Sequence, residues 1–315
     1  MDAAAVRQVR AFNRTVAERI GALTDSFLGR ARPMGESRTL WEIGPDGVEV
    51  RRLRARLGLD SGYASRVLRS LQRHGLITVK ASPGDRRVRF VQLTRAGRAE
   101  RAELDRRADE VAWGFLEPLD LRQRASLVDA VTRAEALLRA SMVTMAVEDP
   151  TTRDAQWCIG QYFAELDRRF ESGFDPSRSI PADARELVLP AGALLIARMR
   201  GEPVGCGALK FHGRAPAELK RMWIAPGMRG SGLGRRLLRE LERHARAGGA
   251  RAVRLETNRA LKEAISLYRS SGYREVAAFN DERYADHWFE KRLSRSRSSN
   301  RVAAARRAAT PRRPP

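Results

Sequence analysis

The stretch that decides the fold of this chain is Met222-Trp223-Ile224-Ala225-Pro226-Gly227-Met228-Arg229-Gly230-Ser231-Gly232-Leu233-Gly234. It predicts a strand, a turn, a glycine-rich loop and then a helix from Leu233 to about Arg246. Because glycine has no Cβ atom, the loop leaves backbone N–H groups open to a ligand, and the helix directs its positive N-terminal end toward the same place. The stretch therefore predicts a binding site for an anionic group.

The spacing of the glycines decides between the possible ligands. A Walker loop has a Lys-Ser or Lys-Thr pair after its last glycine, but two arginines follow here. The dinucleotide fingerprint G-x-G-x-x-G does not fit either, because Leu237 stands in place of its third glycine. The pattern Arg229-x-x-Gly232-x-Gly234, after a strand and a proline, resembles the acetyl-CoA pyrophosphate loop of the GNAT superfamily of N-acetyltransferases. A plain surface turn is the alternative.

Length and charge set the domain organisation. A chain of 315 residues is long enough for two domains with separate cores. Its net charge is +22, but only five of its 60 basic residues are lysines, so part of this charge is explained by a general preference for arginine. The segment 36–95 holds 13 basic and 6 acidic residues. This segment is the candidate for binding nucleic acid.

The cysteines and histidines predict no metal site and no disulfide framework. Cys158 and Cys206 fall in different predicted elements, and the four histidines show no ligand spacing. No apolar run is long enough to span a bilayer, and Arg7 and Arg10 interrupt the N-terminus where a signal peptide needs an apolar core. We expect a cytoplasmic protein without a membrane partner.

Two long amphipathic patterns flank the basic segment. Apolar residues recur at three- and four-residue steps over 3–29 and again over 104–142, and each pattern predicts helices with an apolar stripe. Such stripes need a partner. We expect them to form a homodimer; the alternative is that they pack against each other within one chain.

Within the basic segment, capping signals predict three short helices. One begins with Ser37 as its capping residue and reaches Ile43, and one covers 50–57 and ends at Gly58. A third is capped by Asp60 or Ser61 and stops at Gly75, with buried positions expected at Ala64, Val67, Leu68 and Leu71.

The opposite face of this third helix is polar and basic, which suits a helix that lies in the major groove of DNA, although a solvated helix face is the alternative. The residues of this face are Ser61, Tyr63, Ser65, Arg66, Arg69, Ser70 and Arg73.

A hairpin follows, with strands predicted at 76–80 and 88–93 and a basic tip at 81–87. The residues Asp85-x-Arg87 and Leu93-Thr94-x-x-Gly97 resemble the wing signature of the MarR family of winged-helix regulators. The resemblance implies that the hairpin is a wing and that the preceding helix reads the major groove.

For individual residues, the MarR resemblance implies that Arg86 or Arg87 reaches the minor groove, that Asp85 orients the wing, and that Arg66 and Arg69 lie near the DNA. It also implies a homodimer through the terminal helices on a pseudo-palindromic operator in double-stranded DNA. Phosphate contacts would supply most of the affinity and make it depend on salt.

After about residue 146 the periodicity breaks, and a second set of elements is predicted. We expect an amphipathic helix around 162–170, a hairpin of 193–199 and 204–211, strands at 218–224, 253–257 and 287–293, and a helix at 260–271. The predicted fold class is α+β: a winged helix-turn-helix domain with long dimerisation helices, then a GNAT α/β domain with a mixed, mostly antiparallel sheet. The predicted domains are 1–145 and 153–293, with a disordered basic tail at 294–315.

The GNAT resemblance covers residues 153–293 and implies acetyl-CoA as the acetyl donor. The cofactor-binding positions that it implies are Trp223, Ile224, Arg229, Gly230, Ser231, Gly232, Leu233, Gly234 and Asn258. Tyr268 matches the tyrosine that is often placed to protonate the CoA sulfur; the alternative is a tyrosine of the core beneath the sheet.

Acetyl transfer also needs a base for the amine proton, and Glu218 is the candidate. Glu218 lies early on the strand before the glycine loop, at the same offset as the catalytic glutamate of some GNAT members. The alternative is a surface glutamate that pairs with Lys220 or Arg221.

The two resemblances together indicate a bifunctional bacterial transcriptional regulator and N-acetyltransferase, which binds operator DNA and acetylates a primary amine. The alternative is a transcription factor whose GNAT domain senses acetyl-CoA or another ligand without turnover. The acceptor-binding residues of GNAT domains vary, and here we expect them within 174–180 and 279–283.

Overall fold

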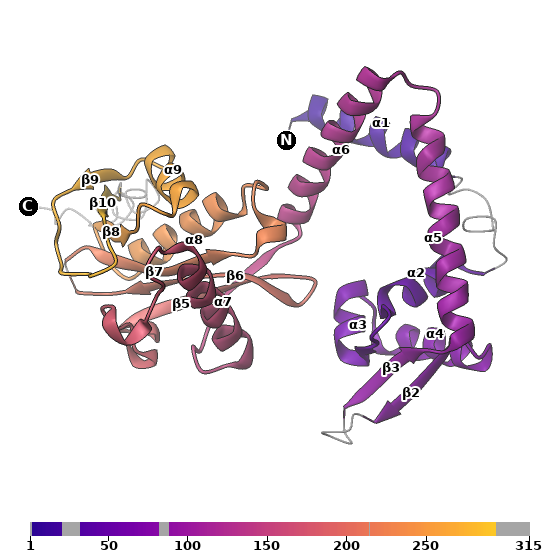
Figure 1. Ribbon diagram of the computed structural model, residues 1–315, viewed down its shortest axis with the longest axis horizontal. Helices are drawn as coiled ribbons and strands as arrows, with labels where there is room; N and C mark the ends of the chain where they lie inside the picture. The colour runs from indigo at the N-terminus through magenta and orange to yellow at the C-terminus, as the bar shows by residue number, and fades with distance from the viewer. Residues whose placement is uncertain (1, 21–31, 82–87, 214, 294–315) are drawn as a thin grey trace, which may run out of the picture. The chain divides into compact units, whose positions relative to one another are not determined.

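The computed structural model describes residues 2–20, 32–81, 88–213 and 215–293. The chain divides into two compact units, Met1–Glu135 with Arg200–Glu202, and Ala136–Met199 with Pro203–Pro315 (Figure 1). The division falls within helix α6 (Leu121–Ser141), earlier in the chain than the boundary predicted at 145–153. Each unit has a hydrophobic core of its own.

The first unit is built from helices and a small sheet of three strands. Its elements after α1 (Ala3–Arg19) and before α6 are α2 (Met34–Ile43), β1 (Val48–Glu49), α3 (Val50–Leu57), α4 (Ser61–Arg73), β2 (Ile77–Ala81), β3 (Arg89–Leu93) and α5 (Arg95–Leu116). The sheet is antiparallel with the order β1-β3-β2. Helices α2, α3 and α4 pack on it around Leu40, Leu53 and Leu71.

The local capping signals of this unit are confirmed at α3 and α4. Helix α3 ends at Gly58, whose φ of +64° lies in the left-handed region. The side chain of Asp60 caps α4 by accepting a hydrogen bond from the amide of Tyr63. The four apolar positions predicted to face the core, Ala64, Val67, Leu68 and Leu71, are all buried.

Three details of this unit differ from the sequence prediction. Helix α2 begins at Met34 with Pro33 at its N-cap, three residues before the predicted start at Ser37. Strand β1 was not predicted, because two residues are too short to show an alternating pattern. The described part of the helix predicted for 3–29 ends at Arg19 with Ile20 as its C-cap, and residues 21–29 lie outside the described residues.

The second unit is a sheet of seven strands with helices on both faces. The strands are β4 (Thr144–Glu148), β5 (Gly192–Met199), β6 (Glu202–Lys210), β7 (Ala217–Ile224), β8 (Ala252–Thr257), β9 (Arg274–Val276) and β10 (His287–Arg292). Their order is β4-β5-β6-β7-β8-β10-β9. The β7–β8 pair is parallel, whereas the described registers of the other pairs are antiparallel, so the predicted mixed, mostly antiparallel sheet is confirmed.

The two faces of this sheet carry separate apolar clusters. Helix α7 (Arg153–Arg169) packs against one face, through residues such as Ala155 and Ile159. Helices α8 (Leu233–Ala247) and α9 (Lys262–Ser270) pack against the other face, where Leu237, Leu241 and Ile265 join the core. Alternation along β5 supplies both clusters, because successive side chains of a strand point to opposite faces.

The middle of the sheet opens between its two parallel strands. β7 and β8 pair only at Ala217 with Val253 and at Glu218 with Arg254, so their carboxyl ends separate. The pairing of β7 with β6 shifts register between Cys206 and Ala208, and Arg221 on the bulged strand has a φ of +53°. These irregularities make room beside the second half of β7.

Strands β4 and β9 were not predicted. β4 alternates in burial only partly and pairs with β5, about fifty residues later in the chain, so its environment is not visible in the local sequence. β9 has three exposed residues at the edge of the sheet.

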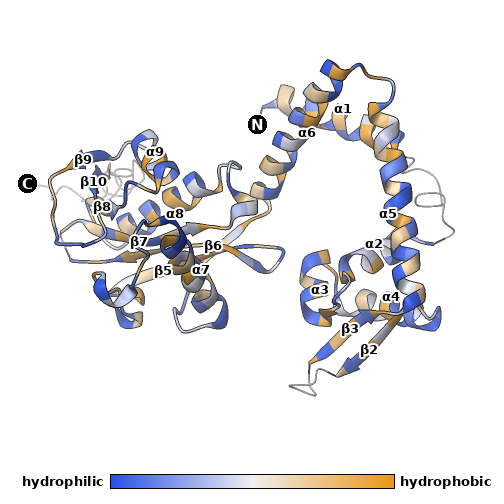
Figure 2. Cartoon of the chain, in the orientation of Figure 1, coloured by the Kyte–Doolittle hydropathy of each residue, from blue (hydrophilic) through white to orange (hydrophobic). Residues whose placement is uncertain are grey.

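None of the helices in the described ranges has the length and apolar character needed to span a bilayer. Figure 2 shows apolar and polar residues alternating along the elements of both units.

Candidate functional site

Two cavities meet in the second unit where β7 and β8 separate. The first has a volume of about 290 Å³ and extends toward the loops after α7 and before β10. The second has a volume of about 490 Å³ and extends toward the glycine loop and α9. They share the lining residues Tyr162, Leu166, Met222, Leu261, Ala264 and Tyr268. A ligand in one cavity can therefore contact a ligand in the other.

The glycine loop forms one wall of the second cavity. Gly230 and Gly232 have φ values of +74° and +82°, and a Cβ atom at either position would stand in open space. Helix α8 begins at Leu233 after Gly232, which has no side chain to cap it; the Leu233 amide donates to the Ser231 hydroxyl over 3.4 Å, and the next amides of the first turn have no intrahelical acceptor. Backbone N–H groups and the helix N-terminus together suit an anionic ligand.

The predicted cofactor positions fall into three groups in the structure. Those that line the second cavity are Trp223, Ile224, Arg229, Gly230, Gly232 and Gly234. Ser231 and Leu233 are buried beneath the loop, where the Ser231 hydroxyl donates to the carbonyl of Met228 over 2.6 Å. Asn258 instead lines the first cavity, and its side-chain amide donates to the carbonyl of Tyr284 over 2.8 Å.

Arginines surround the mouth of the second cavity. Arg229 donates from Nε to the carbonyl of Ile224 over 3.0 Å and forms an ion pair with Glu165. Arg169 pairs with Glu263 at 2.6 Å, and Arg235 donates to Ser270. All three arginines line this cavity together with Glu165 and Glu263, so three positive and two negative charges lie along its edge.

Tyr268 on α9 lies where the two cavities meet. Its side chain is buried, and burial, followed by the nearby charge of Glu256, raises its pKa above the usual value of 10. Tyr162 on α7 lines both cavities as well, and burial raises its pKa in the same way. Both phenols are therefore protonated at neutral pH and can donate a proton.

Glu218 does not reach this site. Its carboxylate accepts from Arg254 over 2.6 Å and lies 3.5 Å from His212 and 3.9 Å from Lys220. Burial raises the pKa of Glu218, but the hydrogen bond from Arg254 and the nearby positive charges outweigh burial and lower it. Glu218 is absent from the linings of both cavities, so among the described residues its surroundings are those of a buried ion-pair partner.

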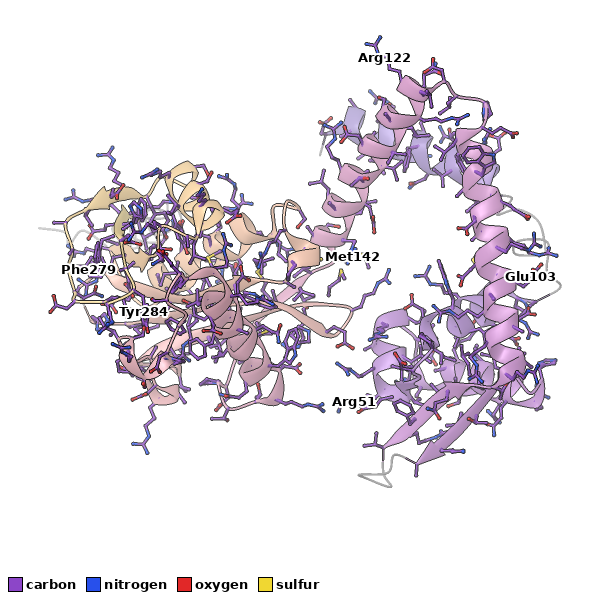
Figure 3. All side chains as sticks on the ribbon, in the orientation of Figure 1. Arg51, Glu103, Arg122, Met142, Phe279 and Tyr284 are labelled. Atoms are coloured by element: carbon purple, nitrogen blue, oxygen red, sulfur yellow. The ribbon has the colours of Figure 1, made fainter. Side chains whose placement is uncertain are left out.

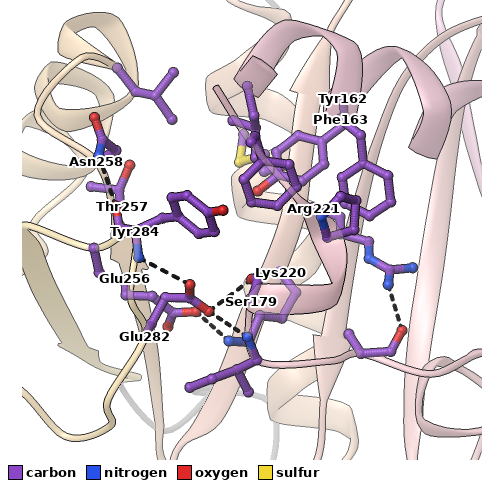
Figure 4. A pocket seen from close by; sticks show the side chains of 18 of the residues that line it. Tyr162, Phe163, Ser179, Lys220, Arg221, Glu256, Thr257, Asn258, Glu282 and Tyr284 are labelled. Atoms are coloured by element: carbon purple, nitrogen blue, oxygen red, sulfur yellow. Dashed lines mark hydrogen bonds and ion pairs between the residues drawn. The ribbon is translucent and has the colours of Figure 1, made fainter. Parts of the chain in front are cut away.

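Two glutamates line the first cavity, together with Asp183 (Figure 4). Glu256, at the carboxyl end of β8, forms an ion pair with Lys220. Glu282 accepts from the Ser179 hydroxyl over 2.8 Å and from the Ile180 amide over 2.7 Å. Glu282 lies within the segment 279–283 expected to bind the acceptor, whereas Glu256 was not selected from the sequence, although a carboxylate at the end of a central strand was a signal that could have identified it.

Aromatic rings form the far wall of the first cavity. Phe163 stacks on Phe174 at 5.6 Å, Phe174 contacts Tyr284 at 4.9 Å, and Tyr284 contacts Phe170 at 5.8 Å. Tyr284 comes from the segment between β9 and β10 that also carries Phe279 (Figure 3). Residues of both segments expected to bind the acceptor, 174–180 and 279–283, line this cavity.

In the first unit, helix α4 presents the face that was selected from the sequence. Its exposed residues include Ser61, Tyr63, Ser65, Arg66, Arg69 and Arg73, whereas Ser70 is half-buried. The Arg66 guanidinium lies 5.7 Å from the centre of the Tyr63 ring. The wing-tip residues Asp85, Arg86 and Arg87 lie outside the described residues. The wing strands also expose Lys80 and Arg89, which the sequence prediction did not include.

The comparisons with known families agree with both units. Residues 160–273 match the acetyltransferase (GNAT) family, and residues 32–88 match the MarR family. The chain is 36% identical to the "IAA acetyltransferase" of Azospirillum brasilense over 44% of this chain and 88% of that protein. It is 38% identical to the "N-alpha-acetyltransferase RimI" of Mycobacterium tuberculosis over 40% of this chain and 76% of that protein.

Among solved structures, a putative acyl-CoA N-acyltransferase from Klebsiella pneumoniae is 30% identical, covering 49% of this chain and 99% of that one with a TM-score of 0.40. The fold and the family matches define a protein with a MarR-type regulator domain followed by an acetyltransferase domain. The chain belongs to the GNAT family of acetyltransferases.

Proposed function

We propose that the protein binds operator DNA through its first unit and transfers an acetyl group from acetyl-CoA to a primary amine in its second unit. The observation that carries the enzymatic part is the position of Tyr268 between two cavities. One cavity ends at a glycine loop suited to a pyrophosphate, and the other is a separate chamber suited to an acceptor. A protein that only senses acetyl-CoA would need the cavity at the glycine loop and no acceptor cavity.

The residues of the second cavity fit acetyl-CoA. Gly230 and Gly232 leave open space where side chains would otherwise stand, and the first turn of α8 offers the amides of Gly234 and Arg235. Arg229 and Arg235 add positive charge for the phosphates. Trp223 and Ile224, at the end of β7, would contact the pantetheine arm. Acetyl-CoA would supply the acetyl group as a thioester. In the transfer, a C–N bond forms to the amine and the C–S bond of the thioester breaks.

Two protons move in this transfer, one away from the amine nitrogen and one to the sulfur. Tyr268 would donate to the sulfur, because its raised pKa keeps it protonated and it lines both cavities. We propose that Glu256, in place of Glu218, accepts the amine proton and that Lys220, its ion-pair partner, orients it. Glu256 lines the acceptor cavity and lies close enough to raise the pKa of Tyr268.

For the first unit, we propose that α4 enters the major groove and that the β2–β3 hairpin contacts the backbone or the minor groove. The exposed face of α4 carries three arginines and Asp60 caps the helix, whereas the opposite face is buried in the core. Lys80 and Arg89 on the wing strands add positive charge.

We also propose a homodimer through the long helices. Large apolar side chains of the first unit are exposed on these helices, among them Val9, Phe12, Trp113, Val128 and Val131, with 48 to 57% of their surface exposed. Apolar stripes of this kind are buried when a second copy packs against them.

The enzymatic proposal is tested by measuring free thiol release from acetyl-CoA by the full-length protein with amino acids, polyamines, aminoglycosides and lysine peptides. We expect release that requires an acceptor and that falls strongly in Tyr268→Phe. Tight binding of acetyl-CoA without release for any acceptor would favour a ligand sensor instead.

A further inference from the structure

A half-buried arginine, Arg221, lines the first cavity. It donates to the carbonyl of Ala182 over 2.7 Å, and its guanidinium lies 5.3 Å from the centre of the Phe163 ring. Arg221 forms no ion pair with any carboxylate in the described part of the chain. Burial therefore lowers its pKa. A guanidinium withdrawn from water in this way is stabilised by a bound anion.

The backbone at Arg221 is held in an unfavourable conformation. Its φ of +53° lies in the left-handed region, which residues other than glycine seldom adopt. The bulge in β7 imposes this conformation, and Arg221 lines the acceptor cavity as a result. Strain of this kind is retained most often at binding sites.

The charges around Arg221 favour a monoanion or a zwitterion over a phosphate group. Lys220 and Arg221 line the cavity, but so do the carboxylates Asp183, Glu256 and Glu282. Lys220 is already paired with Glu256, which leaves Arg221 as the available cation. The remaining carboxylates would repel a dianion. A molecule that bears both a carboxylate and an amine instead matches the positive charge of Arg221 and the negative charges around it.

The position of Arg221 in the strand also places the amine. Its neighbour Met222 lines both cavities, whereas Arg221 lines only the first. An α-amino group is two bonds from the carboxyl carbon of the same molecule. The Arg221 guanidinium lies beside Phe163, whose ring centre is 5.6 Å from that of Tyr162, a residue that lines both cavities. In our scheme a carboxylate at Arg221 directs its α-amino group from this wall toward the junction where Tyr268 lies.

One wall of the cavity is aromatic, and the cavity is small. The rings of Phe163, Phe170, Phe174 and Tyr284 face the space that a side chain of the acceptor would fill. A volume of about 290 Å³ lies at the lower end of the range for small-molecule pockets, about 300–1,000 Å³. These features favour a free small molecule over a lysine within a protein.

We infer that the acetyl acceptor is a free α-amino acid with an apolar or aromatic side chain, and that Arg221 binds its carboxylate. This inference rests on the proposed acetyltransferase function. Arg221 is a specificity-determining residue in this scheme, and the aromatic wall selects the side chain.

The test compares acceptors that differ only in the carboxylate. Thiol release is measured with L-phenylalanine, L-leucine and L-tryptophan and with the matching decarboxylated amines. We expect kcat/KM to be about 10- to 100-fold higher for each amino acid than for its amine, as for a lost charge-assisted hydrogen bond. Arg221→Gln should lower kcat/KM for the amino acids by about the same factor, mainly through KM, and leave the amines within about threefold.

Two further variants and one control guard against misfolding. Arg221→Asn suits the left-handed backbone better than glutamine and should behave like Arg221→Gln, whereas Arg221→Lys should restore part of the preference for amino acids. Arg185→Gln removes an exposed arginine that does not line the cavity and should match the wild type. All variants should bind acetyl-CoA as the wild type does.

If amines or lysine peptides are acetylated with the same kcat/KM as amino acids, the inference is overturned but the acetyltransferase function stands. An equal effect of Arg221→Gln on amino acids and on amines would have the same meaning. If no acceptor releases thiol, the enzymatic proposal fails, and calorimetry with L-phenylalanine on the CoA-loaded protein then decides the subsite. Binding that is lost in Arg221→Gln supports the carboxylate site; absence of binding refutes it.

Discussion

Arg229 of the glycine loop forms an ion pair with Glu165 of α7, and the same carboxylate accepts a hydrogen bond from the Trp223 indole over 2.9 Å. Glu165 is buried, so it fixes the arginine at the mouth of the cofactor cavity. It also places a negative charge beside the proposed phosphate site. The two effects act on acetyl-CoA binding in opposite directions.

We predict that the negative charge has the larger effect. Glu165→Gln keeps a hydrogen-bond acceptor for Trp223 but frees the charge of Arg229, so acetyl-CoA should bind about three- to tenfold more tightly, a gain typical of about 1 kcal/mol. Isothermal titration calorimetry of the full-length protein measures this change. Glu171→Gln, an exposed glutamate just after α7, is the matched control. Weaker binding in Glu165→Gln would show that Glu165 mainly orients Arg229.

Glu218 should act on stability and not on turnover. Because its pKa is lowered in the folded protein, its ionised form stabilises the fold above the unfolded-state pKa, near 4.5, and this stabilisation is lost as the pH falls through the lower folded-state value. At pH 7, Glu218→Gln should reduce the free energy of unfolding by about 1–3 kcal/mol. The difference from the wild type should shrink below pH 4.5.

Thermal unfolding measures this effect, and the transition that acetyl-CoA raises identifies the second unit. Thiol release by Glu218→Gln should stay within about threefold of the wild type. A hundredfold loss of turnover with unchanged stability would instead restore Glu218 as the catalytic base.

DNA affinity should depend on the arginines of α4. If Arg66 contacts a phosphate, Arg66→Ala should weaken binding to a duplex selected from a random-sequence library and lower the slope of log K against log salt by about 1. Arg122→Ala is the control, because Arg122 projects from the start of α6 (Figure 3). Fluorescence anisotropy at several salt concentrations measures the DNA affinity of both variants. An equal loss of affinity in Arg66→Ala and Arg122→Ala would argue against α4 as the binding face.

The dimer should depend on the apolar side of α1. Phe12 is 48% exposed in the single chain, and a charge at this position would be buried in a helix-to-helix interface. We expect Phe12→Glu to shift the protein from dimer to monomer in light scattering and to weaken DNA binding. Gln8→Glu adds the same charge at a polar position and should leave the dimer intact. A dimer that survives Phe12→Glu would place the interface elsewhere.

Local sequence signals predicted much of this fold, and non-local contacts account for what they missed. Asp60 and Gly58 act on their own helix termini, so their effects can be read from neighbouring residues. Glu218, in contrast, was chosen by its distance from the glycine loop, but the parallel pairing with β8 sets Arg254 beside it. The unpaired charge of Arg221 is visible only once the surrounding carboxylates have positions in space.

Substitution of Tyr268 offers the sharpest test of the catalytic proposal. A tyrosine that donates a proton and a tyrosine that only supports the core lead to different expected values of kcat. As a general acid, Tyr268 should contribute about 10²- to 10⁴-fold to kcat, so Tyr268→Phe should lower kcat by that factor and leave the acetyl-CoA Kd unchanged. Its raised pKa keeps the phenol protonated, so its own titration should cause no loss of wild-type kcat between pH 7 and its usual value of 10. Tyr273 provides the matched control, since it is buried, its ring centre lies 5.8 Å from that of Tyr268, and it lines neither cavity. Tyr273→Phe should therefore leave kcat unchanged, and an equal loss in both variants would mean that Tyr268 supports the core and does not donate the proton.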